Sequence, residues 1–418
     1  MCDYHSASST DSGYFVRHRE LGLDHDRRIC RCAVHKFFDD RSEILVRSRS
    51  TEGGVGMKVL HIINDSGLGG AQTLIENLAI EGRNSGVEVH CVVLSTPGKL
   101  APRLERACSS VKHLSIQRSS WRIDTALKKL VKEIRFVNPD VVQSHLLQSD
   151  LISSLALLIF RKKPLLWTIH SSGYGDGDRF RTRVLARVIR FASFRVDRVI
   201  SCTAAASKFS IETGISKQKI VEIPNGVVMP TAQLRKGETG DLVHVGRPHL
   251  MKDHSTLLLA FSRIAKSWPS CGLTFIGVDK SELDVLNRGG VDIDQLPITA
   301  LGALSDPIPV IRTSKFLIIS SAYGEALPMV GIEALSYGVP VLTTNVGSCS
   351  LLAAESWMVC APRDSDGLAD LIRKALALTD TEYDALSIKA RLKAESSFNI
   401  RNTAASYATV YSSVVESA

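Results

Sequence analysis

From Met57 onward, short apolar runs alternate with longer stretches in which apolar residues recur every three or four positions. Short runs rich in Val, Ile and Leu are typical of buried strands, and the longer periodic stretches are typical of amphipathic helices. The first strand-like runs cover residues 58–63, 87–94, 141–144, 165–169 and 199–202. This alternation of strands and helices predicts a doubly wound parallel sheet of the Rossmann type.

The alternation breaks at Met229-Pro230 and across the polar residues 231–241, and it then restarts. The later strand-like runs cover residues 242–245, 273–276, 316–320 and 340–343. Because a chain of 418 residues is too long for a single core, it suits two domains. We therefore expect an α/β fold with two Rossmann-like, doubly wound parallel-sheet domains, residues 57–230 and 231–397.

Residues 1–56 differ from the rest of the chain, because they are rich in Ser, Arg, Asp and His and lack sustained periodicity. They also lack the apolar segment of a signal peptide. The character changes at Met57, where an apolar strand is followed by a glycine-rich loop. We expect Met57 to be the biological start and residues 1–56 to be a disordered tail or an upstream-extended gene prediction.

The net charge of +8 is concentrated in one half, since residues 57–230 carry +11 and residues 231–418 carry −3. Within the basic half, arginines alternate with apolar residues from Arg179 to Arg198. This run fits a helix on an anionic membrane surface, and it fits equally a core-packed helix with a basic solvent face. No nucleic-acid motif accompanies the charge, so we expect no nucleic acid partner. The longest apolar run, 151–160, is about half a transmembrane helix, and we expect it to be buried.

Cysteine and aspartate patterns indicate neither a disulfide framework nor a metal site. The nine cysteines are odd in number and scattered, which favours reduced thiols in a cytosol. Cys30, Cys32 and His35 lack the paired spacing of a zinc site. The Asp-x-Asp pairs at 176/178 and 292/294 do not follow an apolar strand, and we expect them to be loop residues.

Two glutamates lie eight residues apart around a Leu-Pro turn, at Glu325 and Glu333. If a helix begins after Pro328, Glu325 precedes its N-terminus and Glu333 lies on its second turn, facing the same side. The free N–H groups of such a terminus attract phosphate, and carboxylates bind sugar hydroxyls, so the segment suits a nucleotide sugar. The alternative is a solvated helix with two surface glutamates.

A second motif lies upstream, where residues 244–261 read as a strand end, a turn and an amphipathic helix. Arg247 and Lys252 flank the turn. A guanidinium fork together with a compact ammonium is suited to binding a diphosphate.

Together these segments resemble the donor-binding half of retaining glycosyltransferase family 4, with its G-R-x(n)-K-G/D-H and E-x7-E motifs. Further matches are the residues Gly338-Val339-Pro340-Val341 and the Asn225-Gly226-Val227 turn, so the resemblance covers nearly all of residues 57–415. It implies the GT-B architecture, two domains facing each other across a cleft, with a last helix (residues 398–418) that crosses back to the first domain. It also implies a metal-independent, hexosyltransferase-type enzyme without a cofactor, acting in bacterial cell-surface polysaccharide biosynthesis.

The resemblance implies a role for each candidate site residue. Arg247 and Lys252 neutralise the donor diphosphate, Glu333 holds the ribose, and Glu325 and His170 contact the sugar. His170 is favoured over His145, which also follows a strand. The remaining implied donor-binding residues are Gly69, Gly70, Asn225, Leu327, Pro328, Met329 and Val330.

The glycine loop at 67–72 could instead be read as a dinucleotide fingerprint, but the third required glycine is Gln72, so NAD binding is disfavoured. Two positions depart from the family pattern. Leu351 replaces an acid that shapes the sugar pocket in many relatives, and Ala326 replaces a common glycine.

We expect a nucleotide diphosphate sugar as donor and a hydroxyl of a glycan or lipid-linked molecule as acceptor. The expected location is the cytoplasm, with peripheral attachment to the inner membrane through residues 179–198. The alternatives are a nucleotide-sugar epimerase of the same fold and a non-catalytic sugar-binding or assembly protein.

Overall fold

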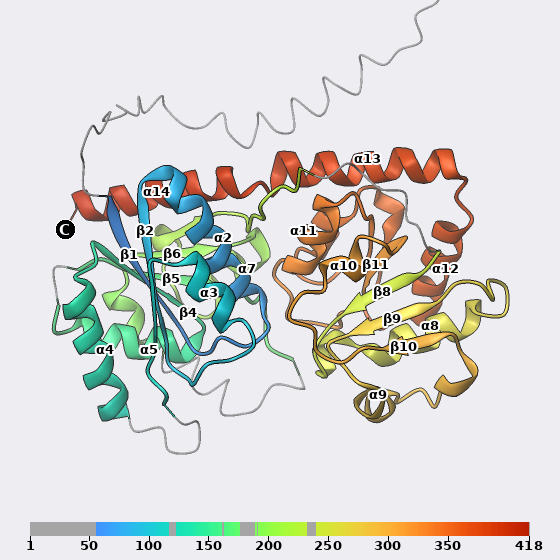
Figure 1. Cartoon of the computed structure of the whole chain (residues 1–418), viewed down its shortest axis with the longest axis horizontal. Helices are drawn as coiled ribbons and strands as arrows, with labels where there is room; N and C mark the ends of the chain where they lie inside the picture. Colours follow the sequence, from blue (N-terminus) through green and yellow to red (C-terminus); the bar gives the residue numbers. More distant parts are fainter. Residues whose placement is uncertain are drawn as a thin grey trace, which may run out of the picture. The chain divides into compact units, whose positions relative to one another are not determined.

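The structure is a computed structural model, and it describes residues 56–116, 123–160, 163–175, 189, 191–231 and 240–417. Two parallel β-sheets with flanking helices make up this part of the chain (Figure 1). Residues 1–55, most of the run from Arg179 to Arg190, and the Asp176/Asp178 pair lie outside the described residues. The predictions made for those segments therefore stay predictions.

The first sheet has the strand order β3-β2-β1-β4-β5-β6-β7, and every pairing in it is parallel. Its strands are β1 Met57–Ile63, β2 Val87–Val93, β3 Ser110–His113, β4 Val141–His145, β5 Leu165–Ile169, β6 Arg198–Ser201 and β7 Ile220–Glu222. The helical segments between them are α2 Gly70–Ser85, α3 Ala101–Ala107, α4 Ile123–Val137, α5 Leu147–Leu157, η2 Ser193–Arg195, α7 Ala204–Glu212 and η3 Lys217–Lys219. Strand order reverses between β1 and β4, and open α/β sheets bind ligands at such a point.

The second sheet has the strand order β10-β9-β8-β11-β12-β13, again with parallel pairings. Its strands are β8 Leu242–Val245, β9 Leu273–Ile276, β10 Ile298–Ala300, β11 Phe316–Ile319, β12 Val341–Thr344 and β13 Val359–Cys360. The accompanying helical segments are η4 Leu250–Lys252, α8 His254–Ile264, α9 Lys280–Leu286, η5 Ile293–Gln295, α10 Ile308–Ile311, α11 Met329–Ser336, η6 Cys349–Leu352, η7 Ser356–Met358 and α12 Ser365–Leu376.

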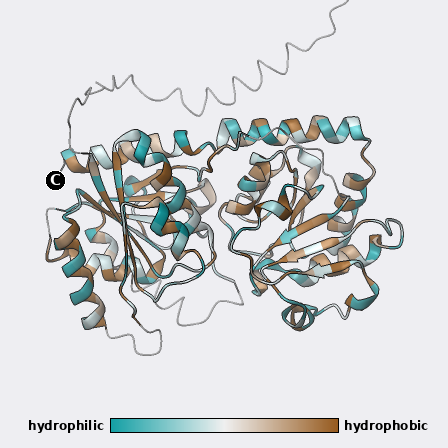
Figure 2. Cartoon of the chain, viewed as in Figure 1, coloured by the Kyte–Doolittle hydropathy of each residue, from teal (hydrophilic) through white to brown (hydrophobic). Residues whose placement is uncertain are grey.

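Two consecutive helices end the chain, α13 Asp380–Ser397 and α14 Ile400–Glu416. Along both, polar and apolar residues alternate in the manner of helices with one packed face (Figure 2). Ala390 and Ala394 of α13 join the core of the second sheet, whereas Tyr407 and Tyr411 of α14 join the core of the first. Backbone bonds from Val227 N to Phe398 O (2.9 Å) and from Ile400 N to Val227 O (3.0 Å) fix the junction of the two helices.

The predicted fold class is confirmed, because both halves of the described chain are Rossmann-like parallel α/β units. Each expected strand is present within one residue at its ends. The short strands β3, β7, β10 and β13 were not predicted. Among the described residues, no helix is long and apolar enough to cross a membrane.

Candidate active site

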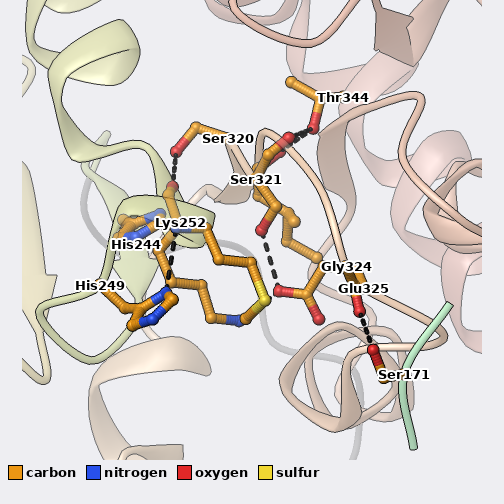
Figure 3. Close-up of polar contacts among 12 residues, drawn as sticks. Ser171, His244, His249, Lys252, Ser320, Ser321, Gly324, Glu325 and Thr344 are labelled. Carbon is orange, nitrogen blue, oxygen red and sulfur yellow. Dashed lines mark hydrogen bonds and ion pairs between the residues drawn. The ribbon is translucent and has the colours of Figure 1, made fainter. Parts of the chain in front are cut away.

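The carboxylate of Glu325 lies at the carboxyl end of β11, on the loop that leads into α11. Glu325 is only 8% exposed. Its Oε1 accepts hydrogen bonds from Lys252 Nζ at 2.5 Å and from Ser321 Oγ at 2.9 Å (Figure 3). The two motifs found in the sequence therefore meet in space, through an ion pair between Lys252 and Glu325.

Hydrogen bonds between neighbouring loops hold this pair in place. Ser320 Oγ donates to the carbonyl of Lys252 at 2.8 Å, and the N–H of Ala322 donates to the carbonyl of Met251 at 2.8 Å. Thr344 Oγ1, at the end of β12, donates to the carbonyl of Ser321 at 2.6 Å (Figure 3). Because β8, β11 and β12 are adjacent, their carboxyl ends bring these loops to one edge of the sheet, where α/β proteins bind ligands.

The loop after β5 of the first sheet also contacts Glu325. Ser171 forms an isolated antiparallel bridge with Glu325, and its Oγ donates to the carbonyl of Gly324 at 3.2 Å (Figure 3). Ser172 donates to the same carbonyl through its N–H at 3.3 Å and to the carbonyl of Glu325 through its Oγ. His170 immediately precedes these two serines. The contact therefore brings the loop that carries His170, after the first sheet's β5, to the loop that carries Glu325, after the second sheet's β11.

Gly347 makes this close approach possible. It has φ +58°, and a Cβ built at this position would lie 1.7 Å from the carbonyl oxygen of Glu325. A side chain would both strain the backbone and displace the Glu325 loop.

His170 is the last of three histidines joined across the first sheet. Its Nε2 lies 3.0 Å from Nδ1 of His145, and Nε2 of His145 lies 2.9 Å from Nδ1 of His61 in β1. The rings are stacked in succession. Burial lowers the pKa of His170 to about 4 and that of His61 to about 3, so the rings are neutral near pH 7. The sequence singled out His170 and His145, but not His61, because a histidine inside a strand gives no motif.

Glu333 lies on the second turn of α11, as the spacing predicts, and faces a different set of groups from Glu325. Burial raises the pKa of Glu333 to about 7; nearby Arg103 opposes this, and Asp306 and Glu76 add to it. Arg103 of α3 pairs with both carboxylate oxygens of Glu76, at 2.9 and 2.6 Å. Arg103 also donates to the carbonyl of Ser305 at 3.2 Å. Nothing in the sequence marks Arg103, because its importance comes from long-range contacts.

The start of α11 is a candidate phosphate site. Pro328 is its N-cap residue and supplies no side-chain cap, which leaves the first N–H groups available. Leu327 and Met329 beside it are buried, and Val330 is half-buried. A Cβ at Gly70 would lie 2.9 Å from Cγ of Met329, so the glycine allows α2 to begin next to α11.

The other predicted residues occupy less connected positions. Arg247, just beyond β8, is exposed, which leaves its guanidinium accessible to a ligand. Gly69 is the N-cap of α2. Asn225 is buried, and its Oδ1 has no hydrogen-bond partner in the described part of the chain. Asp292 is the N-cap residue of η5, whereas Asp294 lies within this short 3-10 helix rather than in a loop and pairs with Lys280.

Comparison with known proteins places this fold and site in a class. A family model described as Glycosyltransferase Family 4 matches residues 68–229, and one described as Glycosyl transferases group 1 matches residues 239–377. Two Rossmann-like halves with ligand-binding loops at the strand ends are the GT-B architecture. The chain belongs to the family-4 type of glycosyltransferases, and it is a glycosyltransferase of glycan synthesis.

Relatives and solved structures agree with this assignment. The glycogen synthase of Mycobacterium tuberculosis is 27% identical over 320 residues, which cover 71% of this chain and 74% of the relative. The capsular polysaccharide biosynthesis glycosyltransferase CapM of Staphylococcus aureus is 22% identical and matches 70% of this chain and 82% of its own. The solved structure of Anabaena HepE in complex with UDP and glucose has a TM-score of 0.72 at 18% identity, covering 85% of this chain and 100% of HepE.

Proposed function

We propose that this chain transfers a hexose or related sugar from a nucleotide diphosphate donor to a hydroxyl of a glycan or lipid-linked acceptor, with retention of anomeric configuration. The observation that carries the proposal is the convergence of Lys252, Glu325 and the uncapped start of α11 at one edge of the second sheet. A cation and free backbone N–H groups suit a diphosphate, and a carboxylate suits sugar hydroxyls. HepE has been solved with UDP-glucose, which supports a donor of this class.

In this mechanism the protein acts by position and charge. Arg247 and Lys252 stabilise the negative charge that grows on the diphosphate as the glycosidic bond breaks. Glu325 orients the sugar that gains positive character, and His170 approaches it from the first sheet. The leaving phosphate oxygen takes the proton of the acceptor hydroxyl on the same face, so no protein base is required, and Arg247 and Lys252 supply the positive charge that a metal ion would otherwise supply.

Lys252 must change partners during this cycle. In the structure it is paired with Glu325, and both side chains are largely buried, at 16% and 10% exposure. When a diphosphate binds, Lys252 turns toward it and the Glu325 carboxylate becomes available to sugar hydroxyls. The exchange links binding of the phosphates to preparation of the sugar site.

Glu333 holds the ribose in this proposal. A carboxylate accepts hydrogen bonds from two adjacent hydroxyls only when it is ionised. Because burial raises the pKa of Glu333 to about 7, its charge in the free protein changes near neutral pH. Ribose hydroxyls stabilise the ionised form, so donor binding should release a proton from Glu333 below this pH.

We further propose that the enzyme acts in cell-surface polysaccharide synthesis at the cytoplasmic face of the membrane. CapM, a capsular polysaccharide enzyme, supports the pathway class. In the basic first half the large aromatics Phe136, Phe191 and Phe194 are exposed, and Phe191 and Phe194 belong to the predicted basic run. Binding to anionic but not neutral vesicles, weakening with salt, would support this location. Equal binding to both vesicle types would contradict it.

The central test is donor binding followed by product analysis. Purified protein is screened by thermal shift against UDP, GDP and ADP sugars, because a ligand of the native state raises its stability. The sugar that stabilises the protein is then supplied with a hydroxyl acceptor, and the anomeric configuration of the product is determined by NMR. A product with inverted configuration would refute retention, and the absence of any stabilising nucleotide sugar would refute the donor class.

A further inference from the structure

A row of polar side chains crosses the interior of the first sheet on one face. His61 of β1 is in register with Gln143 of β4, and His145 of β4 is in register with Thr168 of β5. Gln143 donates to Thr168 Oγ1 at 2.6 Å, so these two side chains are hydrogen-bonded to each other. The three histidines His61, His145 and His170 are hydrogen-bonded to one another, through the two contacts between ring nitrogens described above. We call them the histidine chain.

The ends of this histidine chain differ. At the inner end, Nε2 of His61 is buried and has no hydrogen-bond partner in the described part of the protein. At the outer end, His170 is half-buried, and its contact with His145 is the only ring hydrogen bond that it makes with a described residue. Nδ1 of His170 is therefore the nitrogen through which the chain can reach a ligand.

The protonation states of the three rings depend on one another. A neutral imidazole carries one N–H and one bare nitrogen, and each nitrogen contact needs one proton. In both contacts Nδ1 of one ring meets Nε2 of the next. Consequently all three rings carry the proton on Nδ1, or all three carry it on Nε2.

The buried end selects between the two arrangements. If the protons were on Nε2, His61 would hold an N–H group in the interior without an acceptor. Orphaned buried N–H groups are rarer in proteins than under-satisfied acceptors, so the arrangement with a bare Nε2 is favoured. His61 Nδ1–H then donates to His145 Nε2, and His145 Nδ1–H donates to His170 Nε2.

We propose that His61 and His145 are positioning residues that fix His170 as a hydrogen-bond donor, through Nδ1–H, to an oxygen of the substrate sugar. This inference rests on the proposed function for its ligand. A fixed N–H donor binds a hydroxyl or ring oxygen, which accepts its hydrogen bond, and it discriminates against a group that can only donate. The chain of rings does not conduct protons, because Nε2 of His61 at its inner end meets no acceptor or donor among the residues that the structure describes.

The first test reads the tautomer directly, without a substrate. Full-length protein labelled with nitrogen-15 in histidine is studied by two-bond proton–nitrogen correlation at pH 7. The His170 signals are those that vanish in His170→Gln. We expect a protonated Nδ1 and a bare Nε2 at His170, and a protonated Nε2 would overturn the inference.

The second test uses a pair of substitutions two rings away from the ligand. His61→Asn keeps an N–H donor near the place of Nδ1, whereas His61→Phe keeps a ring without any donor. We expect that in His61→Phe the ring of His170 is no longer restricted to the Nδ1–H tautomer. The KM for the nucleotide sugar should then rise about ten-fold, the scale of one lost hydrogen bond. The affinity for the nucleotide diphosphate alone should not change, and His61→Asn should stay within about two-fold of the wild type in KM.

The outcomes separate this inference from the proposed function. If His61→Asn and His61→Phe raise KM equally while His170 keeps its tautomer, His61 has a packing role only and the inference fails. If no nucleotide sugar binds the wild type, the proposed function fails, and the spectrum of the free protein still decides the tautomer. If His61→Phe does not fold, the wild-type spectrum decides alone.

Discussion

Lys252 and Glu325 are 73 residues apart in the chain, and their side chains form an ion pair at 2.5 Å. The pair lies between two loops whose backbones are also hydrogen-bonded to each other. Removing one member of a largely buried pair leaves the other charge uncompensated, so the residues depend on each other for stability as well as for function.

Lys252→Ala should lower turnover by roughly 10²-fold or more, because the diphosphate loses a cation where negative charge develops. Stability should also fall, since Glu325 loses its partner. Steady-state kinetics at saturating substrates measure the first effect, and urea unfolding measures the second. Lys266→Ala is the matched control, because Lys266 is exposed and follows the C-terminal end of α8, whereas Lys252 precedes the start of that helix. Wild-type turnover in Lys252→Ala would contradict the assignment.

The two motif glutamates should respond differently to loss of charge. Glu333→Gln should weaken donor binding by about 1 to 3 kcal/mol, the range for a charged hydrogen bond, and act mainly on KM. Glu325→Gln should lower kcat and leave affinity for the nucleotide diphosphate nearly unchanged, because Glu325 acts on the reacting sugar. Kinetics combined with calorimetry on the nucleotide diphosphate separate the two effects. The reverse pattern would show that the sugar and the ribose have been assigned to the wrong ends of the site.

Donor affinity should also depend on pH through Glu333. The pKa of this carboxyl in the free protein is raised to about 7, so protons compete with ribose hydroxyls below that pH. Affinity for the nucleotide diphosphate should therefore fall as the pH is lowered from about 8 to 6. Glu333→Gln should remove this part of the pH dependence, which calorimetry at several pH values can measure. A dependence that persists unchanged in the variant would place its origin elsewhere.

Five histidines among the described residues, four of them buried and His170 half-buried, should make the fold sensitive to acid. Burial lowers the pKa of His61, His145, His170, His244 and His254 from the ordinary 6.5, to about 4 for His170 and His254. Each is neutral in the fold but takes up a proton when unfolded below pH 6.5. Stability is therefore full above 6.5 and is lost as the pH falls toward 4, by about 1.4 kcal/mol per pH unit for each proton of difference.

Two carboxyl groups act in the opposite direction. Burial raises the pKa of Asp150 to about 8 and that of Glu333 to about 7, so each is protonated in the fold at a pH where the unfolded chain is ionised. Their effect is a loss of stability that begins near the ordinary carboxyl pKa of about 4 and is complete once the pH has risen through these raised values. Urea midpoints should therefore be highest near neutral pH. Asp150→Asn should remove this contribution between about pH 4 and 8, so the loss on the alkaline side should become smaller and the loss on the acid side steeper.

Gly347→Ala should be much more destabilising than Gly290→Ala. Both glycines have positive φ, +58° and +65°, but a Cβ at Gly290 meets nothing within 4 Å, whereas a Cβ at Gly347 meets the Glu325 carbonyl. Gly290→Ala isolates the backbone strain, about 1 to 2 kcal/mol. Gly347→Ala adds a displacement of the Glu325 loop, so it should lower turnover as well as the melting temperature. Equal effects of the two substitutions would show that the close approach of Gly347 to the Glu325 carbonyl contributes nothing to stability or turnover.

The central strands could be predicted from the sequence because strands buried on both faces are continuous apolar runs, as in Phe316–Ile319. The missed strands are short and lie at a sheet edge, as in Ser110–His113, where Val111 is the only apolar residue. Such segments resemble loops in hydrophobicity, and only pairing with a neighbour makes them strands.

The candidate site could be predicted where its residues lie in contiguous motifs, as for Lys252, Glu325 and Glu333. The role of Arg103 could not, because it depends on Glu76 and Ser305, which other elements bring to it. The same is true of His61, whose polar ring has a neighbour only after β1 and β4 pair. Relations between distant residues arise from the packing of the sheet and leave no local pattern.

Because α14 packs in the core of the first sheet, the half of the chain that is synthesised first depends on a helix that is synthesised much later. Tyr411 donates a hydrogen bond to the buried Gln143, and Tyr407 packs in the same core as Val59 of the first strand. A nascent chain that has emerged as far as Thr231 therefore lacks part of the interior of its first half until α14 has left the ribosome. Termination before α14 would thus leave an exposed apolar groove on the half that was made first, a target for chaperones and proteases.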